Sequence, residues 1–267
     1  MKKIHVIAVL FLSLAIYAPV KAQDANACMQ DLSIFAEFAK VKNYKSAYEP
    51  WKRVRQECPS INAAVFSYGE RILKDLIKNG TPEEAEASKK DLILLYDDWI
   101  TYFPTKRNVS VTGDIMSKKA QALLDYKMAD LKNVYNTFDE AFKKDPESFT
   151  NPKLLYNYFK TLYDRYKAAD QEVTMELLFE KYEEVSEKFD IEGTKLSKKL
   201  DVILKKEEAG TALSSRETRN KRVYNINSNA IGTFLSNLDA IIAKEATCEN
   251  LIPLYQRNFE ANKTDVI

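Results

Sequence analysis

Residues 30–59, QDLSIFAEFAKVKNYKSAYEPWKRVRQECP, decide the fold because they contain two amphipathic helices and a stop signal. Apolar residues recur mainly three and four positions apart over 30–42 and again over 44–57, which is the period of one helix face. Cys58-Pro59-Ser60 is a stop signal that ends the second helix. Two helices joined by so short a turn predict an antiparallel helical hairpin.

The helical pattern continues along most of the chain. Asn79-Gly80 is a typical helix C-terminal signal, and Thr81-Pro82 then supplies a cap and a proline at the first helical position. Gly193 is expected to separate two helices, whereas Val109–Thr112 is the only β-favouring patch and is too short for a sheet. Beyond the first pair, we expect helices at 61–78, 82–103, 114–126, 128–144, 152–168, 171–189, 195–208, 215–244 and 249–261.

Helix pairs that end at a proline can be tested for a fixed period. Pro59, Pro104 and Pro146 are 45 and 42 residues apart. In the first pair, Ala47 and Trp51 stand 12 and 8 residues before Pro59. An alanine, an aromatic residue four positions later and then a proline form the pattern of the second helix of a tetratricopeptide repeat.

The first helix of the pair fits the same family. Ile34 and Phe38 have the spacing of its Leu and Tyr, and Tyr68-Gly69 follows 34 residues after Ile34-Phe35, in the register of its Leu-Gly pair. Residues 30–146 therefore resemble divergent tetratricopeptide repeats. Phe35 and Leu92 should widen the helix spacing, so the pitch of the superhelix cannot be inherited from the family. Four residues in all depart from the family pattern: Asp31, Phe35, Leu92 and Val134.

As a whole, the chain is similar to the exported, tetratricopeptide-like proteins of Bacteroidota, whose role is unassigned. The resemblance implies an all-α fold, a right-handed helical-hairpin solenoid (an α-α superhelix) of about 10 to 11 helices. Residues 23–146 would form the divergent repeats, and 147–267 a further helical region continuous with them and truncated at its C-terminus. The resemblance also implies a periplasmic scaffold, and it brings no catalytic residue.

The composition excludes whole classes of chemistry. The chain has 6 glycines and one histidine, His5. The glycines are too far apart for a GxGxxG or GxxxxGK phosphate-binding loop. Because His5 lies in the segment that we expect to be removed, histidine-based triads and metal sites are excluded from the mature chain. We expect no metal, no cofactor and no catalytic residue.

Residues 1–22 have the pattern of a signal peptide. Lys2-Lys3 is the positive start, Ile4–Ala18 is the apolar stretch, and cleavage is expected between Ala22 and Gln23. The alternative, a transmembrane anchor, would need about 20 apolar residues, and no other stretch of the mature chain could span a bilayer. Removing three lysines changes the net charge from +1 to about −2. This balance gives no electrostatic case for nucleic acid, and the expected location is periplasmic or secreted.

Three cysteines remain in the mature chain, and an exported protein tends to oxidise them. In an antiparallel hairpin the start of the first helix lies beside the end of the second, so we predict a disulfide between Cys28 and Cys58. Two unpaired buried thiols, or a lipid on Cys28, are the alternatives. Cys248 has no evident partner, and no polar capping helix follows 249–261. We therefore expect the sequence to be a fragment of a longer repeat protein.

The function predicted from these features is a non-enzymatic scaffold that binds a protein or peptide. The first helices of such repeats usually line the concave face, where Lys40, Glu70 and Lys74 are the candidate partner contacts. One alternative is a glycan-binding protein of nutrient uptake, because exposed tyrosines can stack on sugars. The least favoured alternative is a histidine-free glycan-cleaving enzyme that uses a carboxylate with Tyr or Lys.

Two basic segments could bind an anionic glycan, phosphate or lipid headgroup, or could be ordinary solvated helix faces. The first is in the 195–208 helix and the second is at the start of the 215–244 helix. The mixed charges favour the solvated face for both. Their cations are Lys198, Lys199, Lys205, Lys206, Arg216, Arg219, Lys221 and Arg222.

Overall fold

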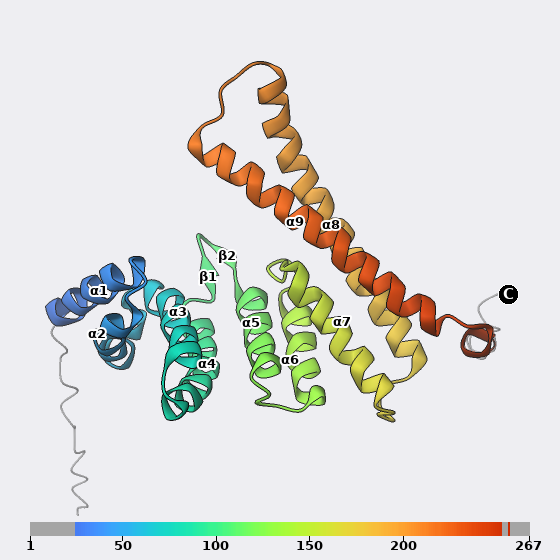
Figure 1. Cartoon of the computed structure of the whole chain (residues 1–267), viewed down its shortest axis with the longest axis horizontal. Coiled ribbons are helices and arrows are strands. Elements are labelled where there is room, and N and C mark those ends of the chain that lie inside the picture. Colours follow the sequence, from blue (N-terminus) through green and yellow to red (C-terminus); the bar gives the residue numbers. More distant parts are fainter. Residues whose placement is uncertain (1–24, 253–255, 257–267) are drawn as a thin grey trace, which may run out of the picture.

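The structure, a computed structural model, describes residues 25–252 and residue 256. The expected signal peptide 1–22, the cleavage site between Ala22 and Gln23, and most of the expected helix 249–261 lie outside the described residues. The described chain is all-α (Figure 1). Its helices are α1 (Ala25–Lys40), α2 (Tyr44–Glu57), α3 (Ala64–Asn79), α4 (Pro82–Tyr102), α5 (Thr112–Asp125), α6 (Leu131–Lys144), α7 (Pro152–Lys167), α8 (Met175–Glu208) and α9 (Ser215–Glu245), with a 3₁₀ turn at Pro59–Ile61.

Successive helices pair as antiparallel hairpins, as the sequence predicts. Helices α1 and α2, α3 and α4, and α5 and α6 are the closest pairs, and each hairpin packs on the next (Figure 1). Helix α7 packs on α6 and then supports the long α8–α9 hairpin. The helical-hairpin fold class is confirmed, whereas the right-handed sense of the superhelix stays a prediction.

Local signals in the sequence explain where the helices begin. The Thr81 side chain accepts from the backbone N–H of Glu84, whose carboxylate accepts in return from the N–H of Thr81. Asn43, Asp130 and Asn151 cap the starts of α2, α6 and α7 with their side-chain oxygens. These caps satisfy backbone donors that would otherwise have no partner in the first turn.

The α2–α3 interface depends on one close approach. Trp51 is buried, and its indole Nε1–H donates to the carbonyl oxygen of Val65 over 2.7 Å. The indole lies directly over Gly69 of α3, so that a Cβ added there would come within 2.7 Å of the ring. A side chain at this position would push the two helices apart, which explains the glycine in the middle of α3.

The apolar core has two clusters that meet at α5. Ile115 and Ala122 belong to the cluster formed with α1–α4, whereas Met116 and Ala120 belong to the cluster formed with α6–α9. The partly buried Ile100 of α4 packs against both clusters. Helix α5 is therefore apolar on two sides, as a helix inside a stack of hairpins must be.

Three expectations about the local structure are wrong. Gly193 does not separate two helices, because α8 runs without a break and the missing Cβ faces Ile231 of α9 across 3.9 Å. Helix α8 begins at Met175 rather than 171, since Thr174 is its cap. The residues around Val109 do pair, as a two-stranded antiparallel hairpin of β1 (Thr105–Lys106) and β2 (Val109–Ser110).

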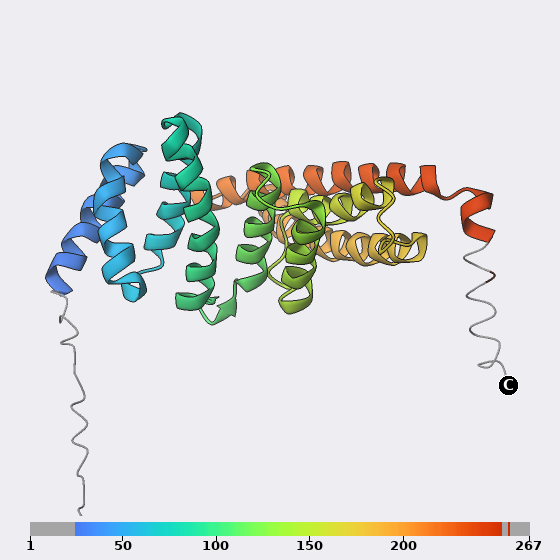
Figure 2. The same ribbon diagram turned by 90° about the horizontal axis from the view of Figure 1, so that it is seen from below.

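The α8–α9 hairpin extends well beyond the helix that supports it. Its base packs on α7, and its tip runs back along the molecule toward the N-terminal hairpins (Figures 1 and 2). Residues 194–230, all of which the structure describes, form the protruding part and are called the arm below. Ile203 is the one buried residue of the arm. The arm is therefore held mainly by its own two helices and by its base.

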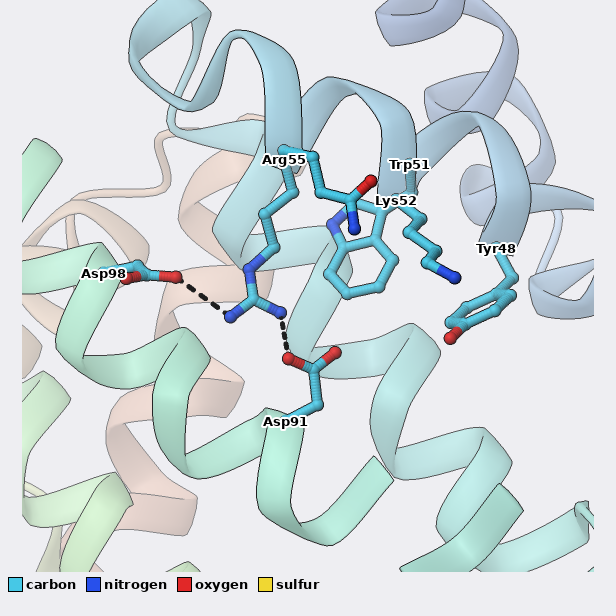
Figure 3. Close-up of a pocket in the computed structure, with 7 residues that line it drawn as sticks. Tyr48, Trp51, Lys52, Arg55, Asp91 and Asp98 are labelled. Carbon is cyan, nitrogen blue, oxygen red and sulfur yellow. Dashed lines mark hydrogen bonds and ion pairs between the residues drawn. The ribbon is translucent and has the colours of Figure 1, made fainter. Parts of the chain in front are cut away.

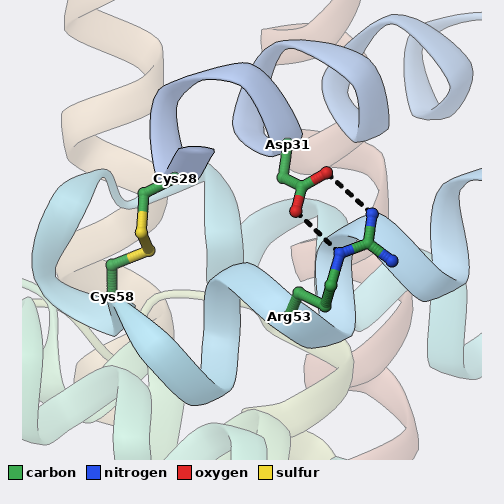
Figure 4. Close-up of a disulfide and its surroundings, with 4 residues drawn as sticks. All are labelled: Cys28, Asp31, Arg53 and Cys58. Atoms are coloured by element: carbon green, nitrogen blue, oxygen red, sulfur yellow. Dashed lines mark hydrogen bonds and ion pairs between the residues drawn. A yellow bond between two sulfur atoms is a disulfide. The ribbon is translucent and has the colours of Figure 1, made fainter. Parts of the chain in front are cut away.

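Cys28 and Cys58 join the two ends of the first hairpin, as the sequence predicts. Their sulfur atoms are 2.05 Å apart, at the distance of a disulfide bond (Figure 4). One turn farther along, Arg53 of α2 donates two hydrogen bonds to the Asp31 carboxylate of α1. Cys248 is exposed and free.

The same substitution at two glycines should have opposite effects. Gly69→Ala forces a methyl group against the Trp51 indole and should lower the free energy of unfolding by about 1–3 kcal/mol. Gly232→Ala, in the exposed middle of α9, meets no atom within 4 Å and should raise it by about 0.5–1 kcal/mol. Urea unfolding followed by circular dichroism measures both. Equal effects at the two sites would contradict the described packing.

Removing the disulfide should destabilise the first hairpin. The double variant Cys28→Ser/Cys58→Ser opens a loop of 30 residues and should lose about 3–4 kcal/mol on the chain-entropy model. Cys248→Ser is the matched control and should change stability little, because its thiol is exposed and unbonded. Thermal unfolding without reductant compares the three proteins, and an unchanged melting temperature in the double variant would disprove the bond.

Candidate functional site

The candidate site is a hollow of about 510 Å³ between α3, the end of α4, the β1–β2 hairpin and the start of α5. This volume is within the range of small-molecule pockets. Three half-buried aromatic side chains contribute to its lining, Tyr68, Trp99 and Phe103. We call it the aromatic hollow, and its other lining residues are Ala63, Ala64, Ser67, Arg71, Thr105, Lys106, Val111, Asp114, Ile115 and Lys118.

Local geometry brings these side chains together. On α3 the lining residues are three or four positions apart, which places them on one helix face. The same spacing holds for Asp114 and Lys118 on α5. Between the strands, Arg107 and Asn108 both have positive φ, the conformation of a tight two-residue hairpin turn. This turn lets the short hairpin project Lys106 at the edge of the hollow.

Charges around the aromatic hollow are mainly positive. Lys118 forms an ion pair of 2.7 Å with Asp114 and lies 5.6 Å from the centre of the Trp99 ring. Arg71 lies 5.4 Å from the centre of the Tyr68 ring. Arg71 and Lys106 are exposed, and no carboxylate of the described chain forms an ion pair with either. Two cations are thus available beside an apolar surface.

A second, smaller hollow of about 190 Å³ shares Lys118 with the first and extends over α3, α5 and the start of α7. Within it, Glu70 pairs with Lys74 over 2.6 Å and accepts a hydrogen bond of 3.0 Å from the Tyr96 hydroxyl. Asn157 of α7 donates to Gln121 of α5 over 2.6 Å nearby. We call it the polar hollow, and most of its charges are already matched.

The Glu70 carboxylate is held in its ionised form. Burial alone would raise its pKa, but the charges of Lys74 and Lys118 and the hydrogen bonds from Lys74 and Tyr96 hold the pKa below its usual value of 4.5. Burial, with the charge of Glu70, raises the pKa of the Tyr96 phenol well above its ordinary value. Acid–base catalysis near neutral pH would need a carboxyl pKa raised toward about 7 or a phenol pKa lowered toward about 7. In this pair both pKa values are shifted away from neutral pH.

The structure brings together two of the three residues that the sequence predicted as partner contacts. Glu70 and Lys74 line the polar hollow. Lys40 lies at the end of α1, outside both hollows, and pairs with Glu37 over 2.6 Å. The aromatic hollow was missed, because Tyr68 was interpreted only as a repeat position and its other residues come from separate elements.

A third hollow, of about 390 Å³, lies between α2 and α4 (Figure 3). Arg55 projects between two carboxylates of α4 and pairs with Asp91 at 2.5 Å and Asp98 at 2.9 Å. Its side chain is 11% exposed and lies 5.5 Å from the Trp51 ring centre. Since both terminal nitrogens of its guanidinium donate to carboxylates of α4, Arg55 fastens α2 to α4.

The described residues contain no group of three or more His, Cys, Asp or Glu side chains that could hold a metal ion. The comparisons with known proteins found no match to a family model, to a curated protein or to a solved structure.

The ionised Glu70 predicts a pH dependence. A folded-state pKa below the unfolded value gives stability that is complete above pH 4.5 and is lost as the pH falls through the folded-state pKa. The melting temperature should therefore fall less between pH 7 and acid pH in Glu70→Gln than in the parent protein. Exposed Glu140→Gln on α6 is the control and should follow the parent curve. Parallel curves for Glu70→Gln and the parent would contradict the assignment.

Proposed function

We propose that this chain is a non-enzymatic, exported, tetratricopeptide-like scaffold that binds an extended acidic segment of a protein partner. The observation that carries the proposal is the aromatic hollow, in which Tyr68, Trp99 and Phe103 line an open space beside the unpaired cations Arg71 and Lys106. An apolar side chain of the partner would lie among the rings, and neighbouring carboxylates would pair with the cations.

The chemistry of the lining selects this class of ligand. Aromatic rings provide a large apolar contact area at a small entropic cost, and they are enriched where proteins bind peptides. A guanidinium such as Arg71 can donate two parallel hydrogen bonds to one carboxylate. The polar hollow continues from Lys118 along α5 toward α7, so an extended chain leaving the aromatic hollow would meet hydrogen-bonding groups there.

Two features support an exported protein. The Cys28–Cys58 disulfide is of a kind that persists in oxidising compartments such as the periplasm. The N-terminal pattern of charge, apolar run and small residues supports a signal peptide that is cleaved after Ala22. Among the helices that the structure describes, none is both long and apolar enough to cross a membrane.

A glycan is the second candidate ligand. Tyr68 and Trp99 are half-buried in the wall of an open hollow, and such rings can also stack on the faces of sugars. We favour the peptide because a neutral sugar would leave the charges of Arg71 and Lys106 unmatched.

Fluorescence anisotropy with a labelled acidic octapeptide, EDLFEDLF, tests the proposal. The mature chain should bind it, and Arg71→Gln/Lys106→Gln should weaken binding by roughly tenfold or more, because both charge-assisted contacts are lost. The control Lys78→Gln/Lys90→Gln removes the same charge from exposed positions of α3 and α4 outside the hollows and should bind like the parent.

A basic octapeptide, KRLFKRLF, and the neutral glucan maltoheptaose complete the experiment. The proposal expects neither to compete. Equal losses in the test and control variants would show attraction to net charge alone and contradict a specific site. Competition by maltoheptaose with no effect of the charge substitutions would favour the glycan instead.

A further inference from the structure

The arm carries a charge opposite to that of the rest of the chain. Residues 194–230 contain nine cations and four carboxylates, a net charge of +5, whereas the remainder has 31 cations and 35 carboxylates, a net charge of −4. The fold separates this charge in space, since the arm protrudes from the body as a long hairpin (Figure 1). The net charge of the whole chain is thus near zero although the arm is strongly basic.

Five of the nine cations of the arm form no ion pair with a described carboxylate. Lys206 pairs with Glu217, and Lys221 with Glu207, across the two helices of the arm. These two pairs join the helices near the tip. Five other cations are exposed and form no ion pair with any carboxylate of the described chain: Lys198, Lys199, Arg216, Arg219 and Arg222.

Aliphatic residues are interleaved with these cations on the outer helix faces. On α9, Arg216, Arg219, Arg222, Val223 and Ile226 follow one another at intervals that keep them within one helix face. Val223 is 46% and Ile226 is 55% exposed. About half of each of these two aliphatic side chains therefore remains in contact with water in the folded chain, where a membrane boundary could remove it from water.

On α8 the same combination recurs. Lys198, Val202 and Lys205 are exposed and lie three or four positions apart, on a face turned away from the buried Ile203, and Lys205 pairs with Asp201 of the same helix. Val202 is 58% exposed. Both helices of the arm thus present aliphatic side chains among long basic ones, whose stems can lie along an apolar surface while their charges stay in water.

We propose that the arm binds anionic lipid headgroups at a membrane surface. Lys and Arg side chains are attracted to the negative surface, and the aliphatic side chains enter the boundary between headgroups and acyl chains. A glycan or a nucleic acid would instead favour aromatic rings for stacking. The arm has one aromatic residue, Tyr224, which is half-buried with Lys199 lying 6.0 Å from its ring centre.

Vesicle flotation of the mature chain tests this proposal. One set of vesicles is phosphatidylcholine alone, and the other is an equimolar mixture with phosphatidylglycerol. The bound fraction should correspond to a partition coefficient at least tenfold higher on the anionic vesicles, and raising the salt should reduce it. Arg216→Gln/Arg219→Gln/Arg222→Gln should lower the coefficient by roughly tenfold or more.

A charge-matched control distinguishes binding by the arm from a general effect of the protein's net charge. Lys45→Gln/Lys78→Gln/Lys90→Gln removes three exposed cations from α2, α3 and α4 and should partition like the parent. Circular dichroism checks that each variant folds, which is expected because every substituted side chain is exposed. Equal losses in the two triple variants would overturn the assignment to the arm.

Substitution of the aliphatic residues distinguishes a lipid surface from other polyanions. Val223→Ser/Ile226→Ser keeps all charges and should weaken vesicle partition by roughly fivefold, while leaving retention on heparin unchanged. If this variant binds vesicles like the parent, the arm attracts polyanions in general and the lipid proposal is wrong. Equal partition of the parent onto neutral and anionic vesicles would overturn it as well.

Discussion

Helix α5 is buried on two sides, and this double packing joins the two halves of the molecule. Ile115 and Ala122 face the N-terminal core cluster, whereas Met116 and Ala120 face the C-terminal one. Small residues allow this close packing: at Gly113 an added Cβ would lie 2.1 Å from the Asp145 carbonyl oxygen. No hairpin could bury its apolar faces alone, so each hairpin stabilises its neighbours. A helix in the middle of the stack must therefore pack against a neighbour on each side. The first hairpin has a neighbour on one side only, and it is the hairpin that the disulfide reinforces.

The packing of α5 also creates both hollows of the candidate site. Its buried faces fix its position beside α3, and its remaining face presents Lys118 to the aromatic and polar hollows together. The α2–α4 side is different, since Arg55 already has two carboxylate partners there (Figure 3). Unmatched cations therefore remain beside the aromatic hollow and on the arm, two surfaces that the stacking leaves open.

Local signals made much of the fold predictable. The bounds of α2 agree with the sequence because Asn43 and Cys58-Pro59 mark its ends, and the cysteine pair follows from hairpin geometry. The prediction for Gly193 was wrong because this glycine faces α9 within a continuous helix. No proline or capping residue follows it to end the helix. The aromatic hollow could not be predicted, since Tyr68, Trp99 and Lys106 meet only after α3, α4 and the β-hairpin have packed. Glu70 and Lys74 were predicted as partner contacts from the usual position of the first helices in such repeats, and both line the polar hollow.

The central claim is that a partner binds across α3 and α5, beside Lys118, and not on the α2–α4 side. Amide hydrogen exchange of the protein, measured with and without the acidic octapeptide EDLFEDLF, tests it most directly because the method reports protection segment by segment. The account predicts that added protection is concentrated in residues 64–74, 103–118 and the end of α4. Protection confined to α2 and the middle of α4 around Arg55, or no change in any segment at saturating peptide, would contradict it.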